Sequence, residues 1–160
     1  MSHLSEEEMV DARNYLLGHC WHLAAVKFPF TEPTLIKLRE QGYKLGIITN
    51  GPKYCQTRKM QLIGICELMD EIIICSDKSL QKPSVKPFIQ MSERLGIPPE
   101  ELVYVGDNPL NDVEASRNAG YLPVWVKTTG FWCFDEIERA PFEIETVEEL
   151  PELLKAIHKK

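Results

Sequence analysis

The chain has 160 residues, which suits one domain with a buried core, and 44% of them are hydrophobic. Its formal net charge is -6, with acidic residues spread along the chain, so we expect no nucleic-acid partner, since phosphate backbones bind basic surfaces. No apolar run approaches the length of a membrane span and no leader opens the chain, which predicts a cytoplasmic protein without a membrane partner. The cysteines are odd in number and form no Cys-x-x-Cys pair, which is typical of reduced thiols.

The N-terminal part of the chain is predicted to be helical. Ser5 and Glu8 form a capping-box pattern, and apolar residues follow at helical spacing, so we expect one amphipathic helix over residues 5–26. A break at residues 28–30 precedes a shorter helix, which begins near Thr31 and stops at Gly42. These patterns divide the chain into an N-terminal helical segment, residues 1–28, and a core domain, residues 29–160.

Strands and helices alternate along the core domain. We expect strands over residues 43–48, 71–75, 102–105 and 122–126. Helices fill the intervals between them, and a last helix has Pro151 in its first turn. Residues 127–141 are predicted to be a loop in which Phe131 and Trp132 pack against the core. Strict alternation implies right-handed crossovers, so the predicted fold class is α/β, a Rossmann-type parallel sheet flanked by helices.

Polar residues follow three of the predicted strands. The first strand leads into a hydroxyl and a tight turn, the second into a lysine, and the third into two carboxylates. The residues are Thr49, Asn50 and Gly51, then Lys82, then Asp107 and Asp112. Ligands of open parallel sheets bind at the carboxyl ends of the strands. A hydroxyl with free backbone N–H groups, a cation and a carboxylate pair together describe a magnesium–phosphate site.

Each of these signals also has a plainer interpretation. Thr49-Asn50-Gly51 suits a β-turn, since Asn and Gly are turn formers. Lys82-Pro83 suits a surface loop, and Asp107 suits the N-cap of a helix. The order of the three signals, each at the end of a predicted strand, favours the joint site.

The three segments resemble motifs II, III and IV of the haloacid dehalogenase (HAD) superfamily, and the resemblance extends from about residue 30 to the C-terminus. It implies a HAD-like fold and a Mg²⁺-dependent phosphatase that hydrolyses small phosphorylated metabolites. The implied phosphate-binding residues are Thr49, Asn50, Gly51 and Lys82. The implied catalytic residues are Lys82 and Asp112, and the implied metal ligands are Asp107 and Asp112.

One part of the HAD pattern is missing from the chain. The family's first motif, Asp-x-Asp-x-Thr, ends the first and central strand of the sheet. Its first Asp is the nucleophile that attacks phosphorus, and its second Asp is the general acid. The six Asp residues of this chain include no pair spaced two apart. We therefore expect the chain to lack both the nucleophile and the usual first strand, and to begin inside or just after the substrate-selecting cap, with residues 1–28 as its remnant or linker.

The missing strand leaves three functions open. The chain is a truncated Mg²⁺-dependent phosphatase, inactive without its nucleophile; or a non-catalytic HAD-like module that binds phosphate, a metal or a partner; or an enzyme completed in trans by another chain. Two apolar strand edges that face a gap are an aggregation hazard unless they are paired or covered. We expect the gap to close by direct pairing, or to be filled by a segment from another chain through homo-oligomerisation or strand exchange.

Overall fold

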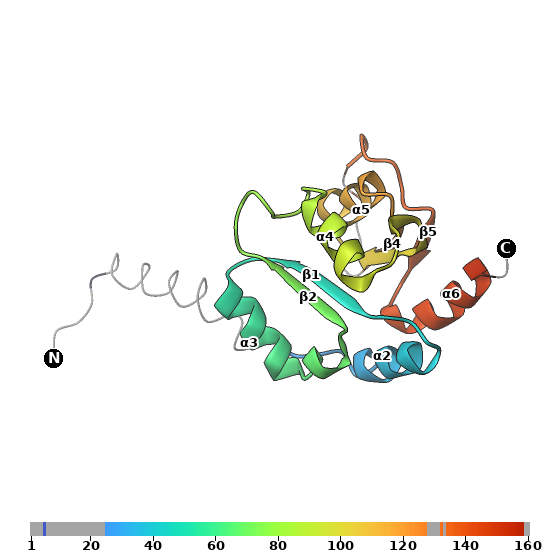
Figure 1. Cartoon of the computed structure of the whole chain (residues 1–160), viewed down its shortest axis with the longest axis horizontal. Coiled ribbons are helices and arrows are strands. Elements are labelled where there is room, and N and C mark those ends of the chain that lie inside the picture. Colours follow the sequence, from blue (N-terminus) through green and yellow to red (C-terminus); the bar gives the residue numbers. More distant parts are fainter. Residues whose placement is uncertain (1–4, 6–24, 128–131, 133, 159–160) are drawn as a thin grey trace.

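The computed structural model describes Ser5, residues 25–127, Trp132 and residues 134–158. In this part of the chain, helices alternate with parallel strands (Figure 1). The strands are β1 (Gly46–Asn50), β2 (Glu71–Cys75), β3 (Val103–Gly106), β4 (Leu122–Val126) and β5 (Phe142–Ile144). The helices are α2 (Thr31–Glu40), α3 (Lys53–Ile63), α4 (Lys86–Leu95), α5 (Ala115–Asn118) and α6 (Leu150–His158). The predicted α/β class is confirmed.

Most predicted elements lie where the sequence pattern placed them. Strands β2 and β4 have the predicted bounds, whereas β1 begins at Gly46 instead of Tyr43. The carboxylate of Asp70 accepts a hydrogen bond from the Leu45 backbone N–H at 2.7 Å, so strand pairing starts one residue later. Strand β5 was not predicted. The helix expected over residues 5–26 falls outside the described residues except for Ser5 and its last two positions.

The strands form two separate sheets. One holds β1 and β2, and the other holds β3, β4 and β5, with every pairing parallel. The first way that we expected the gap to close, direct pairing of the two central edges, is therefore wrong for the described residues. A cavity of about 530 Å³ lies between β1 and β3.

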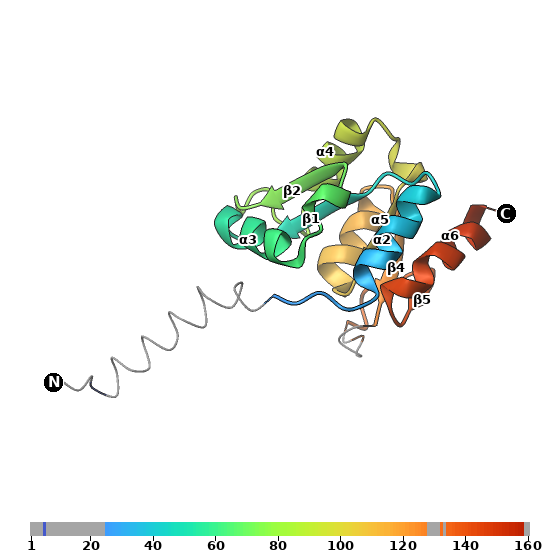
Figure 2. The ribbon, with the colours of Figure 1, turned by 90° about the horizontal axis from the view of Figure 1, so that it is seen from below.

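Two apolar clusters hold the sheets in place. The face of α4 that carries Phe88, Met91 and Leu95 is buried against β1 and β2 and contacts Tyr121 before β4, so one helix packs against both halves of the fold. Helices α2 and α6 lie side by side and cover β4 and β5 from the other face (Figure 2). None of the helices within the described ranges is long and apolar enough to cross a membrane.

Two local contacts fix the C-terminal segment. The Trp132 ring packs edge-on against Trp125 at 5.1 Å between centroids, which attaches the loop to β4. Thr146 and Glu149 form a capping box just before α6. Among the described cysteines, Cys55, Cys66 and Cys75 are free thiols, as expected.

Candidate functional site

Asn50 binds the backbone of Lys82 from both sides. Its side-chain Oδ1 accepts a hydrogen bond from the Lys82 N–H at 2.9 Å, and its Nδ2 donates to the Lys82 carbonyl at 2.9 Å. The two bonds fix the loop after β2 to the end of β1, although 32 residues separate the partners. The side-chain amide predicted to bind phosphate is thus engaged in positioning Lys82.

The side chain of Lys82 forms an ion pair with Asp112. Their Nζ and Oδ1 atoms lie 2.5 Å apart, and the two side chains are only 11% and 8% exposed. The second oxygen of Asp112 accepts a hydrogen bond from the Asn108 N–H at 3.0 Å. Both oxygens of the Asp112 carboxylate are therefore engaged. Of the two roles implied for Asp112, this geometry favours orienting Lys82 over binding a metal.

The position of Asp112 depends on its helical turn and on a glycine. Pro109–Glu114 form a π-helical turn before α5, and the Asn108 side chain caps it by accepting a hydrogen bond from Asn111 N–H at 2.8 Å. A Cβ atom at Gly106 would lie 2.4 Å from both Cβ and Cγ of Asp112. Only glycine at the end of β3 lets the carboxylate come this close.

Tyr104 is a site residue that the sequence prediction missed. Its hydroxyl accepts a hydrogen bond from Lys82 Nζ at 2.8 Å and lies 3.4 Å from Oδ1 of Asp112. Burial, followed by the charge of Asp112, raises the pKa of the Tyr104 hydroxyl well above its ordinary value, so it is a neutral group at physiological pH. One signal was available: Tyr104 is the polar side chain in an otherwise apolar strand, and it shares a sheet face with Gly106.

Asp107 and Thr49 lie at the carboxyl ends of β3 and β1. The Asp107 carbonyl accepts a hydrogen bond from Trp125 Nε1 at 2.9 Å, which fixes the strand end. Neither the Asp107 carboxylate nor the Thr49 hydroxyl is hydrogen-bonded to another side chain within the described ranges. Those ranges also contain no group of three or more His, Cys, Asp or Glu placed to hold a metal. A Mg²⁺ ion held by one or two carboxylates, with water and substrate phosphate as its other ligands, fits a single free carboxylate such as Asp107.

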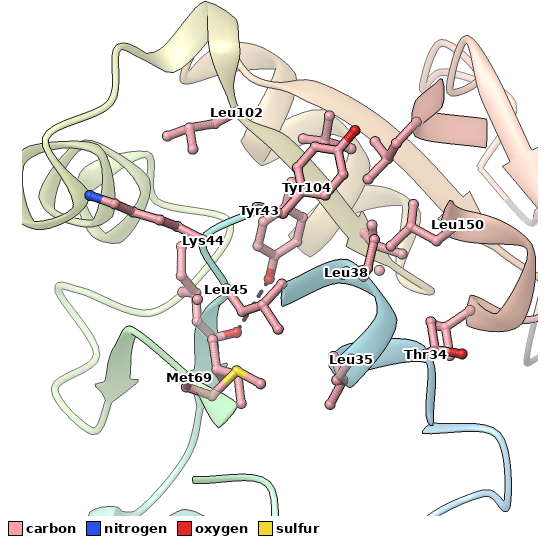
Figure 3. Close-up of a pocket in the computed structure, with 18 of the residues that line it drawn as sticks. Thr34, Leu35, Leu38, Tyr43, Lys44, Leu45, Met69, Leu102, Tyr104 and Leu150 are labelled. Atoms are coloured by element: carbon pink, nitrogen blue, oxygen red, sulfur yellow. Dashed lines mark hydrogen bonds between the residues drawn. The ribbon is translucent and has the colours of Figure 1, made fainter. Parts of the chain in front are cut away.

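The cavity between β1 and β3 is lined mainly by apolar side chains (Figure 3). Leu45 and Ile48 line it from β1 and the residue before it, Val103 and Val105 line it from β3, and Leu38 lines it from α2. We call this cavity the slot. The dashed line in Figure 3 is the hydrogen bond from the Tyr104 hydroxyl to the Ile48 carbonyl, 3.2 Å long, which joins the two strands.

Backbone groups of β1 point into the slot. The Gly51 N–H donates to the Cys75 carbonyl of β2, and backbone groups alternate sides along a strand. Gly46 and Ile48 therefore direct their N–H and C=O groups away from β2, toward β3, whereas the Asn50 carbonyl accepts a hydrogen bond from Gln56 Nε2 of α3 at 2.8 Å.

The edge of β3 that faces β1 also directs backbone groups into the slot. The Leu102 carbonyl accepts a hydrogen bond from the Leu122 N–H beside β4. By the same alternation, Val103 and Val105 direct their backbone groups toward β1, and no strand of the described part pairs with them. The slot is thus bounded by two strand edges that pair with no other strand in the described part of the chain.

Comparison with known proteins identifies relatives of the chain. Residues 19–126 match the sequence profile of haloacid dehalogenase-like hydrolases. The chain is 33% identical to a glyceraldehyde 3-phosphate phosphatase of Methanopyrus kandleri over 135 residues, which cover 82% of this chain and 58% of that protein. It is also 33% identical to a phosphoserine phosphatase of Thermus thermophilus over 99 residues, 62% of this chain and 40% of that one. The match to the glyceraldehyde 3-phosphate phosphatase covers most of this chain but little more than half of that protein. The chain therefore spans only about half the length of such curated relatives.

Two solved structures of HAD proteins are also similar to the chain. A HAD phosphatase of Thermococcus onnurineus superposes with a TM-score of 0.72 at 41% identity, over 79% of this chain and 57% of that one. The HAD-hydrolase YfnB of Bacillus subtilis, solved with bound magnesium, superposes with a TM-score of 0.71 at 25% identity, over 79% of this chain and 55% of that one.

Proposed function

The chain belongs to the haloacid dehalogenase-like hydrolases, and on that premise we propose that it carries the phosphate- and magnesium-binding part of a phosphatase site for small phosphate monoesters. The observation that carries the proposal is the fixed position of Lys82. Its backbone is bound by Asn50 and its ammonium by Asp112, so a buried cation is presented at the carboxyl ends of the strands. A cation held in this way stabilises phosphoryl oxygens.

Each remaining residue has a role in this proposal. The Thr49 hydroxyl and the backbone N–H groups near Gly51 donate to the phosphoryl oxygens. Asp112 orients Lys82, which neutralises phosphoryl charge. Asp107 would hold Mg²⁺, which would supply additional stabilisation of that charge when bound. The relatives' names, including a phosphoglycolate phosphatase of Escherichia coli, support small phosphate monoesters as the substrate class.

We propose further that these 160 residues alone do not turn over substrate. Covalent phosphoryl transfer needs a nucleophile at the phosphate. The carboxylate that contacts Lys82, that of Asp112, has both oxygens engaged, and the free carboxylate of Asp107 is assigned to Mg²⁺ in this proposal. The chain should bind inorganic phosphate without forming an aspartyl-phosphate. A phosphorylated Asp found in this polypeptide after incubation with substrate would overturn this part of the proposal.

The test combines phosphate binding with hydrolysis of an aryl phosphate in the presence and absence of Mg²⁺. Lys82→Ala should abolish phosphate binding, whereas Lys78→Ala, an exposed lysine of the same loop, should leave it unchanged. Equal losses in the two variants, or binding that survives in Lys82→Ala, would refute the assignment of the site. Mg²⁺-dependent hydrolysis by the parent that disappears in Lys82→Ala would instead mean that another chain supplies the nucleophile. No binding by the parent would leave a partner-binding module as the remaining function.

A second candidate, completion of the site by a strand from another polypeptide, is favoured by the slot. The two edges that bound it pair with no strand of the described part on this side, although the Ile48 carbonyl accepts a hydrogen bond from Tyr104, and a strand is the element that pairs with both edges. Apolar side chains of the strand would meet Leu38, Leu45 and Val105. The carboxyl end of β1 and the turn that follows β3 both contact Lys82, so an added strand that runs alongside the two would end near this residue.

Strand addition can be separated from unspecific apolar binding with two peptides. One is a soluble peptide of about seven β-forming residues with lysine at its N-terminus and aspartate at its C-terminus. The other is identical but N-methylated at alternate central residues, so that it has the same side chains without those backbone donors. Strand addition predicts binding of the first peptide and at least tenfold weaker binding of the second. Equal affinity of the two peptides would exclude strand addition.

A further inference from the structure

The packing of the Tyr104 ring does not require its hydroxyl group. The Tyr104 ring lies edge-on against Phe88 with centroids 4.8 Å apart, a contact that a phenylalanine ring would make equally well. A hydroxyl placed among such rings must find hydrogen-bond partners or lose stability. Its partners are Lys82, Asp112 and the Ile48 carbonyl, two side chains of the candidate site and one edge of the slot.

We propose that Tyr104 is a positioning residue, whose hydroxyl fixes the direction of the Lys82 ammonium toward bound phosphate. The proposal rests on the proposed function, and it adds a residue that the motifs of the sequence do not include. Lys82 Nζ has three N–H donors. One points to Asp112 Oδ1 at 2.5 Å and a second to the Tyr104 hydroxyl at 2.8 Å, so the orientation of the third is determined.

The single proton of the hydroxyl strengthens this arrangement. Since the Tyr104 oxygen accepts from Lys82, its proton is available to the Ile48 carbonyl at 3.2 Å or to Asp112 at 3.4 Å. Either bond anchors the oxygen on a second element, the edge of β1 or the turn before α5. Without the hydroxyl, the ammonium keeps its ion pair but regains rotational freedom about the long lysine chain.

The experiment compares Tyr104→Phe with a matched tyrosine. The Tyr121 ring also packs edge-on against Phe88, at 5.6 Å, and its hydroxyl donates to the Phe88 carbonyl at 2.7 Å, but it has no contact with Lys82. We expect Tyr104→Phe to weaken binding of inorganic phosphate, in the presence of Mg²⁺, about three- to tenfold. Tyr121→Phe should bind phosphate as the parent does. Parent-like phosphate affinity in Tyr104→Phe would overturn the proposal.

A second readout is independent of phosphate. The ¹⁵Nζ resonance of Lys82, assigned by its disappearance in Lys82→Arg, reports the hydrogen bonds of the ammonium directly. In the 160-residue chain without ligand, Tyr104→Phe should shift this resonance and speed the exchange of its protons with water, and Tyr121→Phe should do neither. If the parent binds no phosphate, the proposed function fails, while a shifted resonance still supports the role of Tyr104. An unchanged resonance in Tyr104→Phe refutes that role whatever the phosphate affinity is.

Discussion

Gly106→Ala should disrupt the site through a single added methyl group. The new Cβ atom would lie 2.4 Å from Cβ and Cγ of Asp112 and 2.6 Å from its Oδ2, closer than carbon atoms approach one another in folded proteins. The backbone of Gly106 is extended, so the clash with Asp112 alone carries the effect. Asp112 must move, and it then gives up its hydrogen bonds with Asn108 and Lys82.

The expected loss of stability can be worked from these contacts. Overpacking of a filled site costs about 1–3 kcal/mol, and each hydrogen bond to a charged group contributes about 1.5–3 kcal/mol. Relaxation recovers part of this sum, so Gly106→Ala should lower the free energy of unfolding by about 3–5 kcal/mol. Phosphate binding should be lost with it, because Lys82 loses its orienting carboxylate.

Urea unfolding of the parent, Gly106→Ala and Gly46→Ala measures the effect. Gly46 is a matched control in β1, where an added Cβ would meet the Met91 sulfur at 2.8 Å, a flexible side chain that can move aside. The control should lose about 1 kcal/mol or less. Equal losses in the two variants would refute the reasoning, as would a Gly106→Ala protein that unfolds at the parent's urea concentration.

Three further predictions concern the contacts around Lys82 and one distant tyrosine. Asn50→Asp removes the donor to the Lys82 carbonyl and should weaken phosphate binding by about tenfold, with Asn118→Asp, an exposed residue at the end of α5, as a neutral control in the same titration. Asp107→Asn should abolish the Mg²⁺ dependence of phosphate binding while the Mg²⁺-free affinity stays near that of the parent; an unaltered Mg²⁺ dependence would exclude Asp107 as a ligand. Burial raises the pKa of Tyr121 from 10.0 to about 12, so its contribution to stability is complete below pH 10 and is lost as the pH rises through about 12. Measured by urea unfolding across that pH window, the free energy of unfolding should decline by about 2 kcal/mol less in Tyr121→Phe than in the parent. Identical declines in the two proteins would contradict the assignment.

The sequence predicted the fold well where local patterns were strong. The apolar run of β2, bounded by turn residues, had its bounds predicted correctly, and so did β4. β5 could not be predicted because it is three residues long and forms only by pairing with the edge of β4. The direct pairing of β1 with β3 was wrong for a related reason: pairing depends on what lies beneath the strands, and α4 spans both sheets.

The sequence named several residues that the structure brings together, but not all of the contacts between them. The order of the motifs correctly placed Lys82 beside Asp112, 30 residues away along the chain. The motifs also implied that Asn50 contacts phosphate directly. In the structure, the side chain of Asn50 forms two hydrogen bonds with the Lys82 backbone. Tyr104 had no motif to mark it, because its role depends on which side chains tertiary packing brings to its hydroxyl. Hydrogen-bond partners across 20–30 residues are decided by the fold and cannot be taken from spacing alone.

Lys82 connects the two halves of the protein at the site. Its backbone is bound by Asn50 at the end of β1, and its side chain is bound by Tyr104 and Asp112, which belong to β3 and the turn that follows. A residue bound on both sides of the slot fixes the separation of the two strand edges at the same point where it presents its charge. The position of the Lys82 ammonium and the width of the slot are therefore set by the same hydrogen bonds. A strand that enters the slot must fit this width, and it meets the hydrogen bond between the Ile48 carbonyl and the Tyr104 hydroxyl, which also accepts from the Lys82 ammonium at 2.8 Å.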